Sequence, residues 1–108
     1  MRKEFANVCF TLIKDDPLSV VLIGDISHYL LKETEEYDPK RFYNVGICEQ
    51  SIIGMASGLA LEGMRPIVHT IAPFIVERAY EQIKVDLGYQ KTDVTLVSVG
   101  GSYDYSDL

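Results

Sequence analysis

The sequence lacks the features that mark membrane, secreted and nucleic-acid-binding proteins. No apolar run approaches the roughly 20 residues that a transmembrane helix needs. The first residues, Met-Arg-Lys-Glu-Phe, do not contain the apolar stretch of a secretion signal. Ten basic residues stand against 16 acidic ones, giving a net charge of −6, whereas a nucleic-acid binder needs a concentrated basic face. We therefore expect a cytoplasmic protein that binds neither membranes nor nucleic acids.

Cysteines and known ligand-binding motifs are also scarce. The two cysteines, Cys9 and Cys48, lie in apolar patterns that favour buried, reduced thiols over a disulfide. There is no phosphate-binding loop of the Gly-x-Gly-x-x-Gly or Gly-x-x-x-x-Gly-Lys type. His28 and His69 have no cysteine, histidine or carboxylate at ligand spacing, so we predict no metal site in this chain.

What the sequence does contain is a regular alternation of strand-like and helix-like segments. With 108 residues the chain suffices for one domain with a single core. Four short runs are predicted to be strands: residues 19–23, 42–45, 67–71 and 94–99. The first and the last have the two-sided hydrophobicity of strands buried in a parallel sheet. Helices connect such strands by right-handed crossovers. The sequence therefore predicts an α/β fold, a parallel sheet flanked by helices on both faces.

The helices are predicted from apolar periodicity and from the residues that end them. The predicted helical segments are residues 5–13, 28–32, 48–61 and 73–87. Pro17 ends the first one because proline disfavours helical geometry in the residue before it, and Gly63 and Gly88 are placed to end the last two. Residues 33–40 are expected to form a polar surface connection. The buried stripe of the last helix is expected to comprise Val76, Ala79, Tyr80, Ile83 and Leu87.

Ligands of open parallel sheets bind at the loops that follow the carboxyl ends of the strands. The side chains that these loops present are Asp25, Glu49 and Phe74. Taken alone, Asp25 is typical of a turn residue, and Glu49 of a carboxylate that complements a helix dipole. Phe74 is equally typical of a core aromatic and of an exposed stacking platform. Local physics thus predicts a site at the strand ends without identifying its ligand.

A longer segment resembles a known enzyme family. Residues 41–50, Arg-Phe-Tyr-Asn-Val-Gly-Ile-Cys-Glu-Gln, resemble the Arg-Phe-x-[Asn/Asp]-Val-Gly-Ile-x-Glu-Gln segment of transketolases, 1-deoxyxylulose-5-phosphate synthases and 2-oxo acid dehydrogenase β-subunits. The similarity continues through residues 56–66, Phe74 and residues 78–82, and Gly-Asp-Ile-Ser at 24–27 is similar to the family's Ala-Asp-Leu turn. The chain therefore resembles the pyrimidine-binding domain of transketolase-like thiamine diphosphate (ThDP) enzymes.

The resemblance implies roles for the three loop residues. Glu49 matches the glutamate that bonds the N1′ nitrogen of the ThDP aminopyrimidine and so activates the cofactor. Such an acid is protonated or shares its proton, a state that apolar surroundings favour. Phe74 matches the aromatic that stacks on the pyrimidine ring, and Asp25 would lie near the cofactor across the dimer interface, as a further cofactor-binding residue. Ala72-Pro73 stands where the family has Ser-Thr, so the polar contacts beside Phe74 are not carried over.

The resemblance also implies a partner. The family holds the diphosphate and its Mg²⁺ with a Gly-Asp-Gly…Asn motif on a separate domain, and this sequence has no such motif. We therefore expect a diphosphate-binding transketolase subunit or domain as partner, in a homodimer or heterotetramer, and no turnover by the isolated chain. Met1 matches the start of a separately encoded subunit. The glycine-led tail at 100–108 resembles a loop cut short, so we expect the domain, residues 1–108, to be truncated at its C-terminus.

The resulting prediction is a transketolase-like transferase that moves a two-carbon ketol unit between phosphorylated sugars. Within the same cofactor class, the alternative is a 1-deoxyxylulose-5-phosphate synthase or a 2-oxo acid dehydrogenase β-subunit. The segment Arg-Ala-Tyr-Glu-Gln at 78–82 occurs in close variants across all of these, so it does not decide between them. In a different class, the alternative is a non-catalytic dimerisation module with the same fold.

Overall fold

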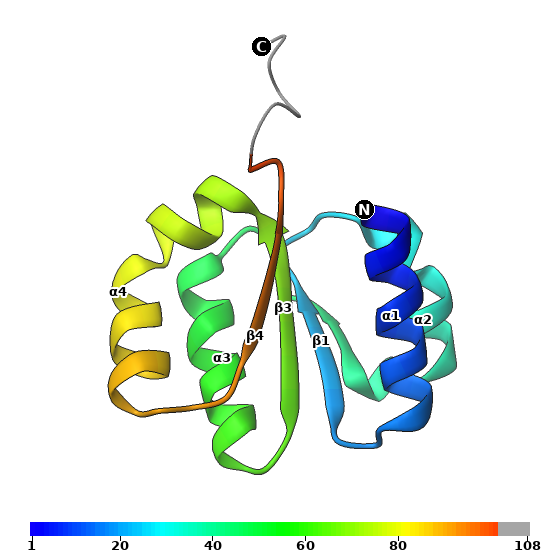
Figure 1. Ribbon diagram of the computed structural model, residues 1–108, viewed down its shortest axis with the longest axis horizontal. Helices are drawn as coiled ribbons and strands as arrows, with labels where there is room; N and C mark the ends of the chain where they lie inside the picture. The colour runs from blue at the N-terminus through cyan, green and yellow to red at the C-terminus, as the bar shows by residue number, and fades with distance from the viewer. Residues whose placement is uncertain (102–108) are drawn as a thin grey trace, which may run out of the picture.

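The computed structural model describes residues 1–101, in which the strands form one parallel sheet (Figure 1). The strands are β1 (Ser19–Ile23), β2 (Phe42–Asn44), β3 (Arg65–Ile71) and β4 (Thr95–Val99). They lie in the order β2-β1-β3-β4, and every pair is parallel. The register places Val21 between Phe42 and Ile67, and His69 beside Val97. The predicted parallel sheet is confirmed.

Helices cover both faces of this sheet (Figure 1). One face carries α1 (Arg2–Asp15), the 3₁₀ turn η1 (His28–Leu31) and α2 (Lys32–Tyr37). The other carries α3 (Glu49–Leu61) and a helical stretch made of η3 (Phe74–Arg78), α4 (Tyr80–Gln82) and η4 (Ile83–Tyr89). A second 3₁₀ turn, η2 (Pro39–Arg41), leads into β2. No helix within residues 1–101 is long and apolar enough to cross a membrane.

The core has two parts because successive side chains of a strand point to opposite faces. Val20 and Leu22 of β1 pack under α3 with Ile52 and Ile53. Val21 and Ile23 pack under α1 with other buried residues, namely Cys9, Ile13, Leu31, Phe42 and Ile67. β1 is buried along its whole length, as predicted for a strand with helices on both sides.

The predicted ends of the first and third helices are confirmed. α1 ends at Asp15, two residues before Pro17. α3 ends at Leu61, and Gly63 follows with φ of 91°, a left-handed conformation that glycine adopts without steric cost.

The predicted surface connection at 33–40 is wrong, because residues 32–37 form α2. This helix buries Thr34 and places Tyr37 against Phe10 of α1, with ring centroids 5.7 Å apart in an edge-to-face arrangement. Its remaining residues are almost all charged. A short helix that buries a threonine instead of an apolar stripe has no hydrophobic periodicity to detect.

The last predicted helix is helical but not continuous. Its turns in η3 and η4 are π turns, and the backbone breaks at Ala79 with φ of −108° and ψ of 20°. A π turn holds more residues than an α turn, so each one rotates the buried stripe. Ile75 and Ala79 are therefore buried, while Val76 and Tyr80 are exposed; their predicted place in the stripe is wrong. Helical geometry continues to residue 89, past the predicted terminator.

β4 differs from the other long strands because it lies at the edge of the sheet. Within the described residues it pairs with β3 alone. Its residues are mostly half-buried, and Val99 alone among them is buried, so the predicted two-sided burial is wrong for this strand. The predicted tail loop falls largely on residues 102–108, which lie outside the described residues.

Candidate active site

The predicted site residues gather where β1, β2 and β3 reach their carboxyl ends. Gly24 follows β1, Asn44 ends β2, and Thr70 lies near the end of β3. Glu49 is the first residue of α3, on the loop that follows β2. This is the edge at which open parallel sheets bind ligands.

Glu49 is buried there, with only 1% of its surface exposed. The Thr70 hydroxyl donates a hydrogen bond to Oε1 at 3.0 Å, and the Arg78 guanidinium donates one to Oε2 at 2.9 Å. Both carboxylate oxygens are thus bonded, and one bond is an ion pair. The burial of Glu49 is thus matched by a cation and a hydroxyl, as buried charges require.

Arg78 links the two residues predicted to contact the pyrimidine. Its guanidinium carbon lies 4.1 Å from the centroid of the Phe74 ring, a cation–π contact, while Nη1 pairs with Glu49. Arg78 was not predicted as a site residue, although it belongs to the family-like segment at 78–82. The spacing of an arginine four residues after an aromatic on one helical segment is the signal that could have found it.

Gly24 brings the end of β1 against Glu49. A Cβ built at Gly24 would lie 3.0 Å from Thr70 Oγ1 and 3.3 Å from Glu49 Oε1, so any larger residue would push on both partners of the Thr70–Glu49 hydrogen bond. The absence of a side chain at position 24 therefore keeps the Glu49 carboxylate in place.

Asp25 is a turn residue with an interstrand role. It has φ of 57°, and it exchanges two hydrogen bonds with Asn44. The Asp25 backbone N–H donates to Asn44 Oδ1 at 3.1 Å, and Asn44 Nδ2 donates to Asp25 Oδ1 at 3.1 Å. Asn44 Oδ1 also accepts from the Gly46 N–H. Asp25 thus links the loop after β1 to the loop that carries Glu49. Within residues 1–101 the Asp25 carboxylate makes no hydrogen bond to Glu49.

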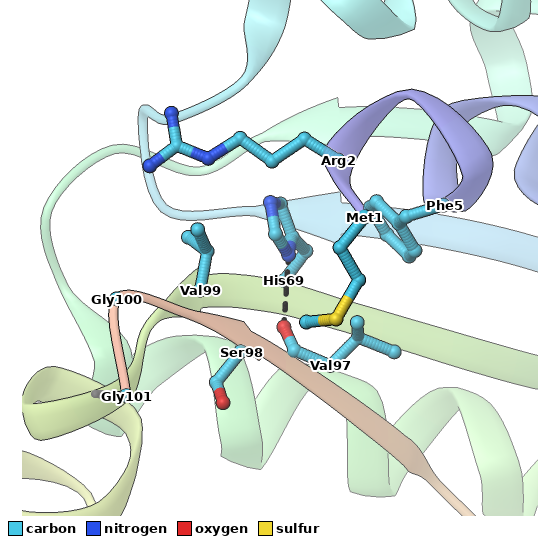
Figure 2. A pocket seen from close by; sticks show the side chains of 9 residues that line it. All are labelled: Met1, Arg2, Phe5, His69, Val97, Ser98, Val99, Gly100 and Gly101. Carbon is cyan, nitrogen blue, oxygen red and sulfur yellow. Dashed lines mark hydrogen bonds between the residues drawn. The ribbon is translucent and has the colours of Figure 1, made fainter. Parts of the chain in front are cut away.

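A separate hollow of about 460 Å³ lies on the α1 side of β3 and β4 (Figure 2). His69 lies in its wall, hydrogen-bonded through Nδ1 to the Val97 carbonyl at 2.8 Å and through Nε2 to Ser27 Oγ at 3.0 Å. The Phe5 ring packs on the imidazole at 4.4 Å, and burial lowers the pKa of His69. The hollow contains none of the predicted site residues. We therefore place the site at Glu49, at the carboxyl ends of β1, β2 and β3.

Potential metal ligands do not cluster in the part of the chain that the structure describes. Within residues 1–101, no three histidine, cysteine, aspartate or glutamate side chains are grouped so that they could hold a metal ion. Both cysteines are free; Cys9 is buried and Cys48 half-buried. Burial raises the pKa of the Cys9 thiol to about 12.

Known proteins match the chain in sequence and in structure. A model of the family described as "Transketolase, pyrimidine binding domain" matches residues 1–107. The "Uncharacterized 33.6 kDa protein in fasciation locus" of Rhodococcoides fascians is 50% identical over 108 residues, which are all of this chain and 35% of that protein. One of the subunits of the apulose-4-phosphate transketolase of Actinobacillus succinogenes is 46% identical over 70 residues, 65% of this chain and 22% of that relative.

A solved structure described as "Split gene transketolase, inactive beta4 tetramer" superposes with a TM-score of 0.82. It is 32% identical and covers 90% of this chain, which spans 33% of that protein. The chain therefore corresponds to about a third or less of the length of these relatives.

Proposed function

The chain belongs to the family of transketolase pyrimidine-binding domains, and from this premise we propose that it supplies the aminopyrimidine half of a ThDP site. The proposed enzyme is a transketolase-like transferase that moves a two-carbon ketol unit between phosphorylated sugars. The proposal that the substrates are phosphorylated sugars rests on the similarity to a subunit of apulose-4-phosphate transketolase.

The observation that carries this proposal is the buried Glu49 carboxylate beside Phe74 at the carboxyl edge of the sheet. The residues fit an aminopyrimidine: Glu49 offers an oxygen to a ring nitrogen, Phe74 offers a flat apolar face, and Gly24 adds no side chain. When bound, ThDP supplies the nucleophilic carbon that ketol transfer requires. Glu49 would hold a proton at the ring nitrogen, and Thr70 would fix the orientation of Glu49 through its hydrogen bond.

Asp25 is proposed to act on the cofactor through the loop that it holds. Its paired hydrogen bonds with Asn44 tie the turn after β1 to the loop leading into Glu49. This tie limits movement of the first turn of α3, and a small displacement of a catalytic group is enough to reduce activity greatly.

The diphosphate and Mg²⁺ are assigned to a partner subunit or domain, in a homodimer or a heterotetramer. Support comes from two similar proteins that are named as parts of multi-subunit enzymes. One is a transketolase subunit, and the other is a split-gene transketolase in the form of a tetramer. The fraction of these relatives that the chain spans is consistent with a site that it shares with another domain.

Replacing Glu49 tests the proposal directly. The full-length protein containing this chain, combined with its diphosphate-binding partner, ThDP and Mg²⁺, is expected to catalyse ketol transfer. Glu49→Gln keeps the size of the side chain but cannot exchange a proton, so we expect kcat to fall by roughly 100-fold or more. Glu62→Gln, an exposed carboxylate at the other end of α3, serves as the matched control and should retain activity.

An undiminished rate in Glu49→Gln would contradict the assigned role. Turnover only with 2-oxo acid donors would shift the assignment to a 1-deoxyxylulose-5-phosphate synthase or a 2-oxo acid dehydrogenase β-subunit. No turnover with any ketose or 2-oxo acid donor would support the dimerisation module.

A further inference from the structure

We propose that Arg78 is a counter-ion that the incoming ligand displaces: an aromatic ring stacking on Phe74 removes Arg78 from Glu49 and thereby opens the carboxylate for bonding. The inference rests on the proposed function, which supplies the ring. It assigns Arg78 as a positioning residue that couples the two contacts of the site.

The first step of the argument is access to Glu49. The carboxylate is covered, and each of its oxygens is bonded to a protein group. Because only 1% of the Glu49 surface is exposed, a ring nitrogen can reach the carboxylate only if a group that covers it moves aside. Thr70 is itself buried within β3, whereas the Arg78 side chain is 37% exposed. Arg78 is therefore the partner that can move into solvent.

The second step is competition for Phe74. The Arg78 guanidinium lies over the ring of Phe74, and a planar ligand stacked on that face needs the same space. The Arg78 side chain thus occupies both groups that the pyrimidine would contact, the Phe74 ring and the Glu49 carboxylate. A ring that takes the face of Phe74 removes the ion pair of Glu49 in the same event.

The third step is charge. Once Arg78 has left, an ionised Glu49 is a buried charge without a cation, which is strongly unfavourable. A proton shared with the ring nitrogen removes that cost. Stacking on Phe74 is therefore coupled to proton uptake at Glu49, and the acid acquires its proton only when the ring has arrived.

The backbone permits the movement. Arg78 is the last residue of η3, directly before the break at Ala79. A rearrangement of its side chain at this position does not require a regular α-helix to unwind. Wide turns of this kind are frequent at functional sites.

Infrared spectroscopy of the cofactor-free full-length protein tests the counter-ion role. At neutral pH the wild type and Glu49→Gln should have the same spectrum in the region of the carboxylic acid carbonyl band. Arg78→Met should acquire such a band, because burial without a cation favours the neutral acid, and the double variant with Glu49→Gln should lose it. Arg78→Gln is a second neutral variant in case Arg78→Met does not fold. Arg78→Lys keeps the charge and should resemble the wild type, as should Lys84→Met, which removes an exposed charge from η4.

Calorimetric titration with ThDP and Mg²⁺, in the presence of the partner and in buffers of different ionisation enthalpy, tests the coupling. The wild type should take up about one proton per site more than Arg78→Met, in which Glu49 is already protonated. The difference between the two proteins cancels the protons exchanged by the cofactor's own diphosphate. A side chain with a purely structural role would weaken binding without changing the proton count.

Each negative result would contradict a different part of the proposal. A Glu49 acid band in the wild type, or its absence from both neutral variants, would overturn the counter-ion role whether or not ThDP binds. Equal proton uptake by wild type and Arg78→Met would overturn the coupling and leave the proposed function standing. No ThDP binding by the wild type with its partner would overturn the proposed function together with the coupling, and the infrared result alone would then decide the role of Arg78.

Discussion

His69 is a histidine that the fold holds in its neutral form. Its ring lies under Phe5 and is bonded to Val97 and Ser27. Burial is the main cause of its lowered pKa; the charge of Arg2 adds to the effect, and the hydrogen bond with Val97 opposes it. The unfolded chain therefore binds a proton at a higher pH than the folded chain does. Stability must then fall as the pH drops below the ordinary value of 6.5.

We predict that the free energy of unfolding decreases with a slope of up to about 1.4 kcal/mol per pH unit below the unfolded pKa of His69. Urea unfolding at pH values between about 7.5 and 5 measures it. This window avoids Asp16 and Asp38, whose pKa values are lowered by hydrogen bonds from Arg65 and Arg41.

Two histidine variants test the source of this slope, one at His69 and a matched control at His28. His69→Gln should lose most of the slope whatever its absolute stability, whereas His28→Gln, at an exposed position, should retain it. An identical slope in His69→Gln and the wild type would show that another group causes the pH dependence.

Single residues of the site differ in how far the sequence could predict them. Asp25, Glu49 and Phe74 follow strands, and the strand-end rule placed them at one edge before any contact was known. Arg78 could not be placed in this way, because it lies one turn into a helical segment. Its role depends on the wide turns of η3, which bring it over Phe74 and Glu49, and no local pattern predicted those turns.

Arg41 joins several elements at the opposite end of the sheet from the site. Its guanidinium donates to the carbonyls of Ile13, Asp16 and Ser19 and to the carboxylate of Asp38 at 2.7 Å. One side chain thus connects the end of α1, the start of β1 and the turn η2. Arginine suits this place because its planar group carries several fixed donors.

We predict that Arg41→Lys lowers the free energy of unfolding by roughly 2–3 kcal/mol, because an ammonium group cannot reach all of these acceptors. Arg65→Lys is the control: its side chain is 67% exposed, against 15% for Arg41, and among residues 1–101 it pairs with Asp16 alone. A surface pair of this kind should change stability by less than about 1 kcal/mol. Denaturant midpoints measure both changes, and equal losses in the two variants would contradict the role of Arg41 as a connector.

Whole elements were predictable where burial is two-sided or strongly periodic. The strands at 19–23 and 67–71, α1 and α3 have that property, and their existence and type followed from it. α2 did not, because its single buried residue is Thr34. The segment from Phe74 to Tyr89 was predicted as a helix, but its buried side depends on π turns, which bury Ile75 with Ala79 and leave Val76 and Tyr80 exposed.

At the scale of the whole molecule, the chain carries one half of the proposed site. In the proposed function, Glu49 and Phe74 contact the pyrimidine end of ThDP with Arg78 as a positioning residue, and no Gly-Asp-Gly…Asn motif for the diphosphate occurs in the sequence. The binding free energy of a cofactor with a highly charged end depends largely on the groups that hold that end.

We therefore predict that the 108-residue chain by itself binds ThDP weakly, and that adding a diphosphate-binding partner restores tight binding. Calorimetric titration in Mg²⁺ buffer, with and without the partner, measures the difference. Thiamine without the diphosphate is the informative control ligand, because it should bind about equally weakly in both cases. Micromolar binding of ThDP by the chain alone would contradict the division of the site.

The position of β4 has a consequence for the behaviour of the polypeptide. β4 is bonded to β3 on one side. Within residues 1–101 no strand pairs with its other side, where its five residues present a row of amide and carbonyl groups. Such a row is a template on which a further strand can add. β2 at the opposite edge has three residues, too few to offer a comparable template. Self-association of the isolated chain should therefore begin along β4, and covering that one edge should suffice to keep it monodisperse.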